Sequence, residues 1–205
     1  MPKRKIVLFG GTFDPIHLGH TIVVKEAGEF IGAEKIIFIP AKCSPLKKNS
    51  PLASDRDRFK MIDLAIGGVE KFEVSDYELN KPRPSYTLDT IRYFQARFGD
   101  EVSIYWLLGA DCIEELSGWY RIDDLIDECN LCLMLRAGYE KPDFSKFEKI
   151  LGHKHIAKLQ QNIIETSLID ISSTEIRRRL AGGLDVSDML NPDVAEYIRK
   201  NKLYK

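Results

Sequence analysis

Short, uninterrupted apolar runs that alternate with segments of helical periodicity constrain the fold of this 205-residue chain more than any other feature. The apolar runs are continuous rather than alternating, which is typical of strands buried on both faces of a parallel sheet. They lie at residues 5–9, 35–40, 72–76, 102–109, 130–136 and 162–171. Segments with helical spacing lie at residues 19–31, 55–67, 86–98, 110–128, 174–181 and 192–201. The order predicts an α/β fold, with a doubly wound parallel sheet, helices on both faces, and a ligand crevice at the carboxyl ends of the strands.

Length and charge narrow the classes of protein further. A chain of 205 residues suits one domain, so we expect residues 1–205 to form one unit, with a C-terminal helical part at residues 172–205. Thirty Lys and Arg against 31 Asp and Glu leave a net charge of -1, which argues against a nucleic-acid partner. No apolar run approaches the roughly 20 residues of a membrane span, and the first residues lack the pattern of a signal peptide. We therefore expect a cytoplasmic protein without a membrane partner, and self-association stays open.

The cysteines do not suggest a metal centre. Cys129 and Cys132 form a CxxC motif, but they adjoin or lie within an expected buried strand, where residues three apart point to opposite faces. We therefore predict that both are thiols of the core.

A glycine-rich turn between the first strand and the first helix is the main functional signal. Its sequence, GGTFDPIHLGH, runs from Gly10 to His20. Glycines allow a backbone to approach a phosphate closely, and a helix N-terminus offers N–H groups and a partial positive charge. Neither GxGxxG nor GxxxxGK[ST] is present; instead, His17 and His20 share one face of the helix and can donate to phosphate oxygens. Thr12 adds a hydroxyl, and Asp14 is expected to cap the helix or stabilise the turn.

A second helix start lies near the C-terminus, in SSTEIR. Ser172 and Glu175 have the spacing of a capping box. That motif does not explain the hydroxyls of Ser173 and Thr174 or the guanidinium of Arg177, which are groups that a triphosphate requires. We therefore expect a second anion-binding element here.

These two motifs resemble those of a known superfamily. GGTFDPIHLGH is similar to the signature of the nucleotidyltransferases, whose fold also underlies the class I aminoacyl-tRNA synthetases, and ISSTEIR is similar to the ISSTxIR motif used toward ATP phosphates. The segments SYTLDT (85–90), LLGADC (107–112) and WYRIDDL (119–125) and the ending NPDVAEYIRKNKLY resemble the bacterial nicotinate mononucleotide adenylyltransferases from end to end. The resemblance implies a Rossmann-like fold and a reaction in NAD synthesis. In that reaction ATP, with Mg²⁺, and nicotinate mononucleotide give deamido-NAD and pyrophosphate.

The residues and the resemblance together predict the site. The expected catalytic residues are His17, His20, Thr12 and Arg177. The expected ATP contacts are Gly10, Gly11, His20, Gly109, Asp111, Arg136, Ser172, Ser173, Thr174 and Arg177. The expected nicotinate mononucleotide contacts are Thr12, Phe13, Lys42, Lys47, Thr87, Trp119 and Tyr120, with Trp119 stacking on the pyridine ring. No metal site made by the protein alone is expected, because Mg²⁺ would arrive bound to ATP.

The chain departs from the family pattern in two loops. Residues 44–47 read SPLK where the family usually has PPHK or PPHR, and residues 135–138 read LRAG where it has PRPG. Both departures weaken the prediction that residues of these two loops bind substrate. Neither lies within GGTFDPIHLGH or SSTEIR.

Alternative functions remain. Nicotinamide mononucleotide or phosphopantetheine could be the acceptor, although a phosphopantetheine enzyme has no reason to carry SYTLDT and GWYR. A nucleotide-sensing module without turnover is an alternative of a different class, which the intact HxGH motif and Arg177 disfavour. A synthetase relative would require a KMSKS-like loop and an anticodon domain, and the sequence has neither.

Overall fold

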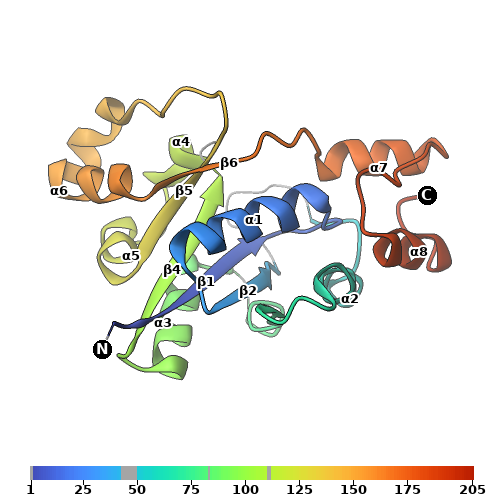
Figure 1. Cartoon of the computed structure of the whole chain (residues 1–205), viewed down its shortest axis with the longest axis horizontal. Coiled ribbons are helices and arrows are strands. Elements are labelled where there is room, and N and C mark those ends of the chain that lie inside the picture. Colours follow the sequence, from blue (N-terminus) through green and yellow to red (C-terminus); the bar gives the residue numbers. More distant parts are fainter. Residues whose placement is uncertain (1, 43–49, 83, 110–111) are drawn as a thin grey trace.

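A single parallel sheet organises the protein in the computed structural model, which describes residues 2–42, 50–82, 84–109 and 112–205. Its order is β3-β2-β1-β4-β5-β6, and every neighbouring pair is parallel. The strands are β1 (Arg4–Gly11), β2 (Lys35–Pro40), β3 (Phe72–Val74), β4 (Val102–Gly109), β5 (Asn130–Arg136) and β6 (Ile163–Thr166). The strand order reverses between β1 and β4, and the carboxyl ends of these two strands are where such a fold binds ligands; Figure 1 shows β1 and β4 side by side at the centre of the sheet. The predicted doubly wound fold is confirmed.

The helices depart from the prediction in two places. They are α1 (Leu18–Ile31), α2 (Asp55–Ile66), α3 (Thr87–Phe98), α4 (Ile113–Leu116), α5 (Ile122–Glu128), η2 (Phe144–Phe147), α6 (Glu148–Gln161), α7 (Ser173–Ala181) and α8 (Pro192–Lys200). The prediction of one continuous helix at 110–128 is wrong, because Arg121 takes a left-handed conformation (φ 50°) that separates α4 from α5. Helix α6 was not predicted, since Gly152 (φ 71°) interrupts its helical periodicity. The last strand ends at Thr166 rather than 171.

Both faces of the sheet are buried, as the continuous apolar runs predicted. Ile6 and Leu8 of β1 pack in one core with α3, α5 and α6. Val7 and Phe9 point the other way, into a second core with α1, α2, α7 and α8. Figure 1 shows α7 beside the N-terminal end of α1, so the C-terminal part of the chain lies next to the glycine-rich turn.

The two cysteines of the CxxC motif are core thiols, as predicted. Cys129 is 4% exposed and belongs to the first core, whereas Cys132 is 1% exposed and belongs to the second. Burial raises the pKa of each thiol to about 12. Both thiols therefore stay protonated and unreactive near neutral pH.

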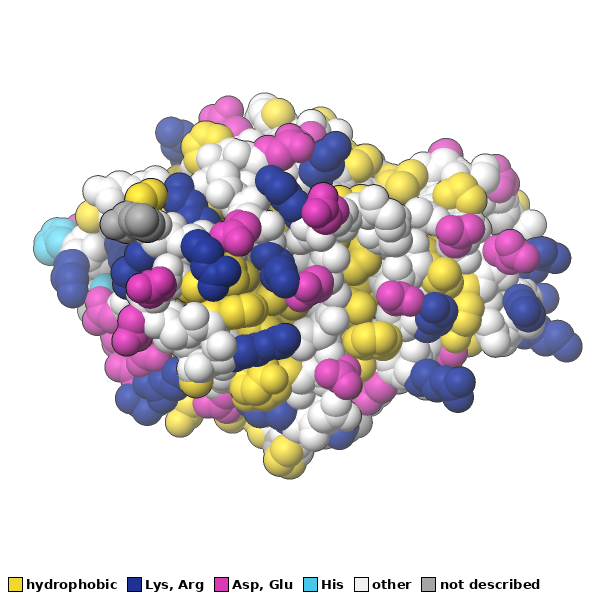
Figure 2. All heavy atoms as spheres, turned by 60° about the horizontal axis from the view of Figure 1, so that its bottom comes forward, with side chains coloured by type: hydrophobic (Ala, Val, Ile, Leu, Met, Phe, Trp, Pro, Cys, Tyr) yellow, Lys and Arg dark blue, Asp and Glu magenta, His cyan; other side chains and the backbone are white. Residues whose placement is uncertain are grey.

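The surface agrees with the near-zero net charge. On the face shown in Figure 2, basic and acidic side chains intermingle instead of gathering into a stripe of one sign. Across the described part of the chain, no helix combines the length and apolarity that crossing a membrane would require.

Candidate active site

The glycine-rich turn positions two histidine rings at the start of α1. His17 is the N-cap of this helix and His20 lies one turn further, so their rings stack with centroids 3.7 Å apart and planes 28° apart. The backbone N–H of His17 donates to Nδ1 of His20 over 3.3 Å. Because Nδ1 accepts this bond, the proton of the neutral His20 ring lies on Nε2. The local structure therefore fixes the tautomer in which His20 can donate from Nε2.

Burial keeps the other ring neutral. His17 is 7% exposed, and this burial lowers its pKa from 6.5 to about 4. Its Nδ1 has no hydrogen-bond partner among the residues that the structure describes. A Cβ on Gly19 would lie 3.0 Å from that Nδ1, so a glycine at this position leaves room for the ring. The His17 ring is therefore a neutral imidazole near neutral pH rather than a fixed cation.

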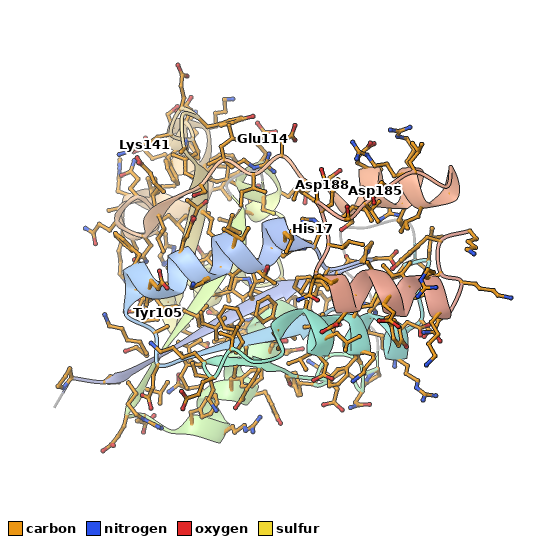
Figure 3. All side chains as sticks on the ribbon, turned by 45° about the vertical axis from the view of Figure 1, so that its right-hand side comes forward. His17, Tyr105, Glu114, Lys141, Asp185 and Asp188 are labelled. Atoms are coloured by element: carbon orange, nitrogen blue, oxygen red, sulfur yellow. The ribbon has the colours of Figure 1, made fainter. Side chains whose placement is uncertain are left out.

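A cavity of about 1050 Å³ lies at the carboxyl ends of the strands, next to the two histidines. Figure 3 shows His17 at the N-terminal end of α1, close to the segment that carries Asp188. That segment contributes a carbonyl to the helix end, because the N–H of Leu18 donates to the oxygen of Met189 over 3.0 Å. One of the helix N–H groups that the sequence suggested for phosphate is therefore already used.

The structure brings part of the predicted site to this cavity. The predicted residues that line it are His17, His20, Gly109, Arg136, Ser172, Ser173 and Thr174. The predicted residues that do not line it are Gly10, Gly11, Thr12, Phe13, Lys42, Thr87, Trp119, Tyr120 and Arg177. Asp111 and Lys47 lie outside the described residues.

Gly10 and Gly11 have a packing role that sequence reasoning did not foresee. A Cβ on Gly10 would lie 2.4 Å from the ring of Trp106 in β4, and one on Gly11 would lie 2.8 Å from the ring of Phe13. Both distances are shorter than real Cβ contacts, so the glycines make room for two aromatic side chains. Phe13 itself is 2% exposed and belongs to the second core.

Asp14 does not cap the helix, contrary to one of the two roles expected for it. The N-cap is His17, and the Asp14 carboxylate, 5% exposed, faces another loop. It accepts the N–H groups of Leu52 over 2.8 Å and Ala53 over 3.1 Å, and the hydroxyl of Tyr204 over 2.7 Å. Asp14 therefore joins the glycine-rich turn to two segments that are distant in sequence.

The second motif contacts the first directly. Ser172 caps α7 by accepting the N–H of Glu175, as predicted, although the carboxylate of Glu175 pairs with two arginines further along the helix. The hydroxyl of Ser173 donates to the Pro15 carbonyl over 2.8 Å, and Arg177 Nη1 donates to the Asp14 carbonyl over 2.7 Å. These bonds explain two groups that a capping box left unexplained. The role of Arg177 toward ATP stays a prediction.

The segments that carry the residues expected for the pyridine ring are joined by a ring stack outside this cavity. Thr87 is the first residue of α3, and the preceding Tyr86 stacks on Tyr120 with ring centroids 4.4 Å apart. Trp119 packs against the first core, and its buried Nε1 has no partner among the described residues. Lys42 donates to the Lys81 carbonyl over 3.1 Å, which ties the end of β2 to the loop before α3.

Sequence reasoning missed two segments of the cavity wall. The first follows β5 and includes Tyr139, Asp143 and Lys146; the second follows β6 and includes Ser167 and Ile169. Both follow strands, so the rule that ligands bind at the carboxyl ends of strands could have identified them. Neither carries a motif that would have attracted attention.

Comparisons with known proteins agree with this arrangement. The family model described as cytidylyltransferase-like matches residues 8–179. A relative from Clostridium perfringens, named "Probable nicotinate-nucleotide adenylyltransferase", is 36% identical over 204 residues, covering 98% of both chains. A relative of the same name from Pectobacterium atrosepticum is 36% identical, covering 96% of this chain and 97% of its own.

A solved structure shares the fold at lower identity. The nicotinic acid mononucleotide adenylyltransferase of Plasmodium falciparum, complexed with NaAD, superposes with a TM-score of 0.74 at 20% identity, covering 98% of this chain and 97% of its own. The chain belongs to the cytidylyltransferase-like family and, within it, to the nicotinate-nucleotide adenylyltransferases.

Proposed function

We propose that this protein transfers the adenylyl group of ATP to nicotinate mononucleotide, giving nicotinate adenine dinucleotide and pyrophosphate. One observation carries the proposal beyond family membership. Ser173 and Arg177 hydrogen-bond the turn that holds His17 and His20, and the N-terminal residues of both helices line one cavity. A substrate with several phosphates suits such a pair of helix ends.

The reaction is a direct displacement at phosphorus. An oxygen of the mononucleotide 5′-phosphate attacks the α-phosphorus of ATP, and the bond from that phosphorus to the bridging oxygen of pyrophosphate breaks. The attacking group is already an anion, so no general base is required. Catalysis then consists of positioning the two nucleotides and stabilising the charge that develops on the α-phosphate and on pyrophosphate.

The His20 Nε2–H and the His17 ring would face the α-phosphate, together with the hydroxyl of Thr12 and the guanidinium of Arg177. A neutral His17 ring suits this role, since it does not hold the product pyrophosphate through a full charge. Mg²⁺ would enter as part of the nucleotide substrate, held mainly by phosphate oxygens. Among the described residues, no group of three His, Cys, Asp or Glu side chains is arranged to hold a metal ion.

The two nucleotides would divide the crevice. ATP would contact the carboxyl ends of β1, β4 and β5 and the start of α7, at Gly10, Gly11, Gly109, Asp111, Arg136, Ser172, Ser173 and Thr174. Nicotinate mononucleotide would contact Thr12, the backbone of Phe13, Lys42, Lys47, Thr87, Trp119 and Tyr120. An indole face suits a flat, electron-poor pyridine ring, and the N–H and O–H donors of this region suit its carboxylate.

Pyrophosphate release tests the proposal. The purified protein is incubated with ATP, Mg²⁺ and, in separate reactions, nicotinate mononucleotide, nicotinamide mononucleotide or phosphopantetheine. We expect the highest kcat/KM with nicotinate mononucleotide. A preference for either other acceptor would correct the substrate, and no release with any acceptor would refute adenylyl transfer.

A further inference from the structure

The buried carboxylate of Asp14 collects three hydrogen bonds from two distant segments. Leu52 and Ala53, which follow the loop after β2, donate their backbone N–H groups over 2.8 and 3.1 Å. Tyr204, the residue before the C-terminus, donates its hydroxyl over 2.7 Å. With 5% exposure, the carboxylate depends on these donors to replace water. Losing any one of them changes how the turn is held.

The backbone conformation and the packing of Tyr204 hold its hydroxyl beside Asp14. Tyr204 has a left-handed backbone (φ 63°), and its ring packs against the second core beside α8. Burial and contact with the carboxylate raise the pKa of Tyr204, so its hydroxyl keeps its proton and remains a donor at any pH suited to an assay.

Two backbone carbonyls of the same turn accept hydrogen bonds from arginine side chains. The carbonyl of Thr12 accepts a bond of 2.7 Å from the fully buried Arg58, and the carbonyl of Asp14 accepts one from Arg177. Phe13, between these two carbonyls, has a left-handed backbone (φ 49°), a conformation that a non-glycine residue keeps only when its surroundings impose it. The carboxylate of Asp14 supplies the third attachment of this turn, three residues before His17.

We infer that Tyr204 is a positioning residue for adenylyl transfer, which acts through Asp14 on the turn that carries Thr12 and His17 and on the end of the loop after β2. This inference rests on the proposed function. Tyr204 does not line the cavity, yet it would thereby contribute to the geometry of the transfer site. Tyr204 touches no reacting atom and acts only by fixing groups that do.

The chain provides a matched control. Tyr197 in α8 also donates its hydroxyl to a carboxylate, that of Asp57 in α2, over 2.9 Å. Tyr197→Phe removes the same chemical bond from the same C-terminal part of the molecule without touching Asp14. A purely structural role for both tyrosines predicts equal effects of Tyr197→Phe and Tyr204→Phe, whereas positioning predicts that only Tyr204→Phe slows turnover.

The experiment compares the full-length wild type with both variants at a temperature where circular dichroism shows all three to be folded. For Tyr204→Phe we expect kcat to fall about tenfold, with both KM values changing less than about threefold, because lost positioning weakens transition-state rather than ground-state contacts. We expect Tyr197→Phe to stay within about twofold of the wild type. A kcat for Tyr204→Phe within twofold of the wild type, or an equal loss in both variants, overturns the inference.

Amide hydrogen exchange separates this inference from the proposed function, because it needs no substrate. Exchange at Leu52 and Ala53 should become about tenfold faster in Tyr204→Phe and stay unchanged in Tyr197→Phe. Unchanged exchange in Tyr204→Phe refutes the proposed route through Asp14 even if kcat falls. An inactive wild type would instead refute adenylyl transfer, and exchange would still report whether Tyr204 holds the turn.

A double variant tests the route in a second way. Asp14→Asn keeps the size of the side chain but loses its charge and one acceptor. Because the remaining amide oxygen can still accept the Tyr204 hydroxyl, the cycle uses Asp14→Ala, which removes both acceptor oxygens. If Tyr204 acts through Asp14, adding Tyr204→Phe to Asp14→Ala lowers kcat by less than about twofold further. Multiplying effects would show that Tyr204 acts independently of Asp14 and would overturn the inference.

Discussion

The two halves of the crevice are built in different ways. In the half that we assign to phosphates, hydrogen bonds from distant segments hold the backbone, as with Ser173 to Pro15 and Arg177 to Asp14. In the half that we assign to the pyridine ring, the segments that carry Thr87 and Trp119 meet through a ring stack, that of Tyr86 on Tyr120.

This difference matches the chemistry proposed for each half. Charge that develops on a phosphoryl group is stabilised by donors that are already in place, because moving them during the reaction costs energy. A flat ring is recognised by area and by a few polar atoms, and these tolerate small displacements. We therefore expect substitutions in the phosphate half to change kcat and those in the pyridine half to change KM.

The largest effect should come from His20→Ala. This change removes the Nε2 donor from the phosphate half, and loss of one such donor commonly lowers kcat by about 10²–10³-fold. We expect KM for both nucleotides to stay within about threefold in steady-state pyrophosphate-release assays.

His20→Asn sharpens that test. Asparagine can still accept the N–H of His17 near the position of Nδ1, but it does not reach the position of Nε2. We expect kcat to be as low as in His20→Ala. Normal turnover in His20→Asn would show that His20 acts by capping the helix rather than by donating from Nε2. It would contradict the difference that we propose between the two halves.

Sequence reasoning located the phosphate half more completely than the pyridine half, and the reason is physical. A strand, a turn with glycines and a helix N-terminus are contiguous in sequence, so one motif places His17 and His20 with correct spacing. Trp119 and Thr87 come from different crossovers, and only the folded sheet brings their segments together through Tyr86 and Tyr120.

Tertiary contacts account for what the sequence did not reveal. The apolar runs specified a two-faced sheet, but they could not show that Gly10 makes room for Trp106 or that Asp14 bonds Tyr204, 190 residues away. The break at Arg121 was missed for a related reason, because a left-handed arginine follows from tertiary context rather than from local propensity.

Two buried groups, His17 in the phosphate half and Glu78 in the loop before α3, should make stability depend on pH with opposite signs. Burial lowers the pKa of His17 from 6.5 to about 4, so between these values the unfolded chain binds a proton that the folded ring does not. The free energy of unfolding therefore falls as pH drops through this window, by about 3 kcal/mol from this group. His17→Gln should flatten that dependence in urea titrations at pH values from about 4 to 7, and an unchanged slope would contradict the buried neutral ring.

Glu78 provides the opposite case in the loop before α3. It is 4% exposed, its carboxyl accepts the Thr90 hydroxyl over 2.7 Å, and burial raises its pKa. The folded state keeps a proton that the unfolded state loses, so the stability from this group is present below pH 4.5 and is lost as pH rises through the raised pKa. Glu78→Gln should flatten the dependence above pH 4.5, and a steeper loss would contradict this sign.

Gly10→Ala tests how much the close packing of Gly10 in the phosphate half contributes to the stability of the protein. The new Cβ would lie 2.4 Å from the ring of Trp106, a rigid group that is 5% exposed, so we expect a loss of about 1–3 kcal/mol in unfolding free energy. Gly28→Ala is the control, because its Cβ would meet the flexible end of the Ile36 side chain, with Cδ1 at 2.3 Å and Cγ1 at 3.2 Å, within a helix that favours alanine. Equal losses in denaturant titrations would contradict the argument from ring rigidity.

The smallest expected effect belongs to the pyridine half. Trp119→Leu removes the indole face, and stacking of about 1–1.5 kcal/mol corresponds to a rise of roughly tenfold in KM for nicotinate mononucleotide. The KM for ATP should stay within about twofold, and kcat should change little, since the pyridine ring lies away from the reacting phosphorus. Combined with His20→Ala, the two losses in kcat/KM should multiply because the halves share no side chain. A kcat that falls in Trp119→Leu alone would show that the pyridine half also sets the geometry of transfer, and the division between the halves would then fail.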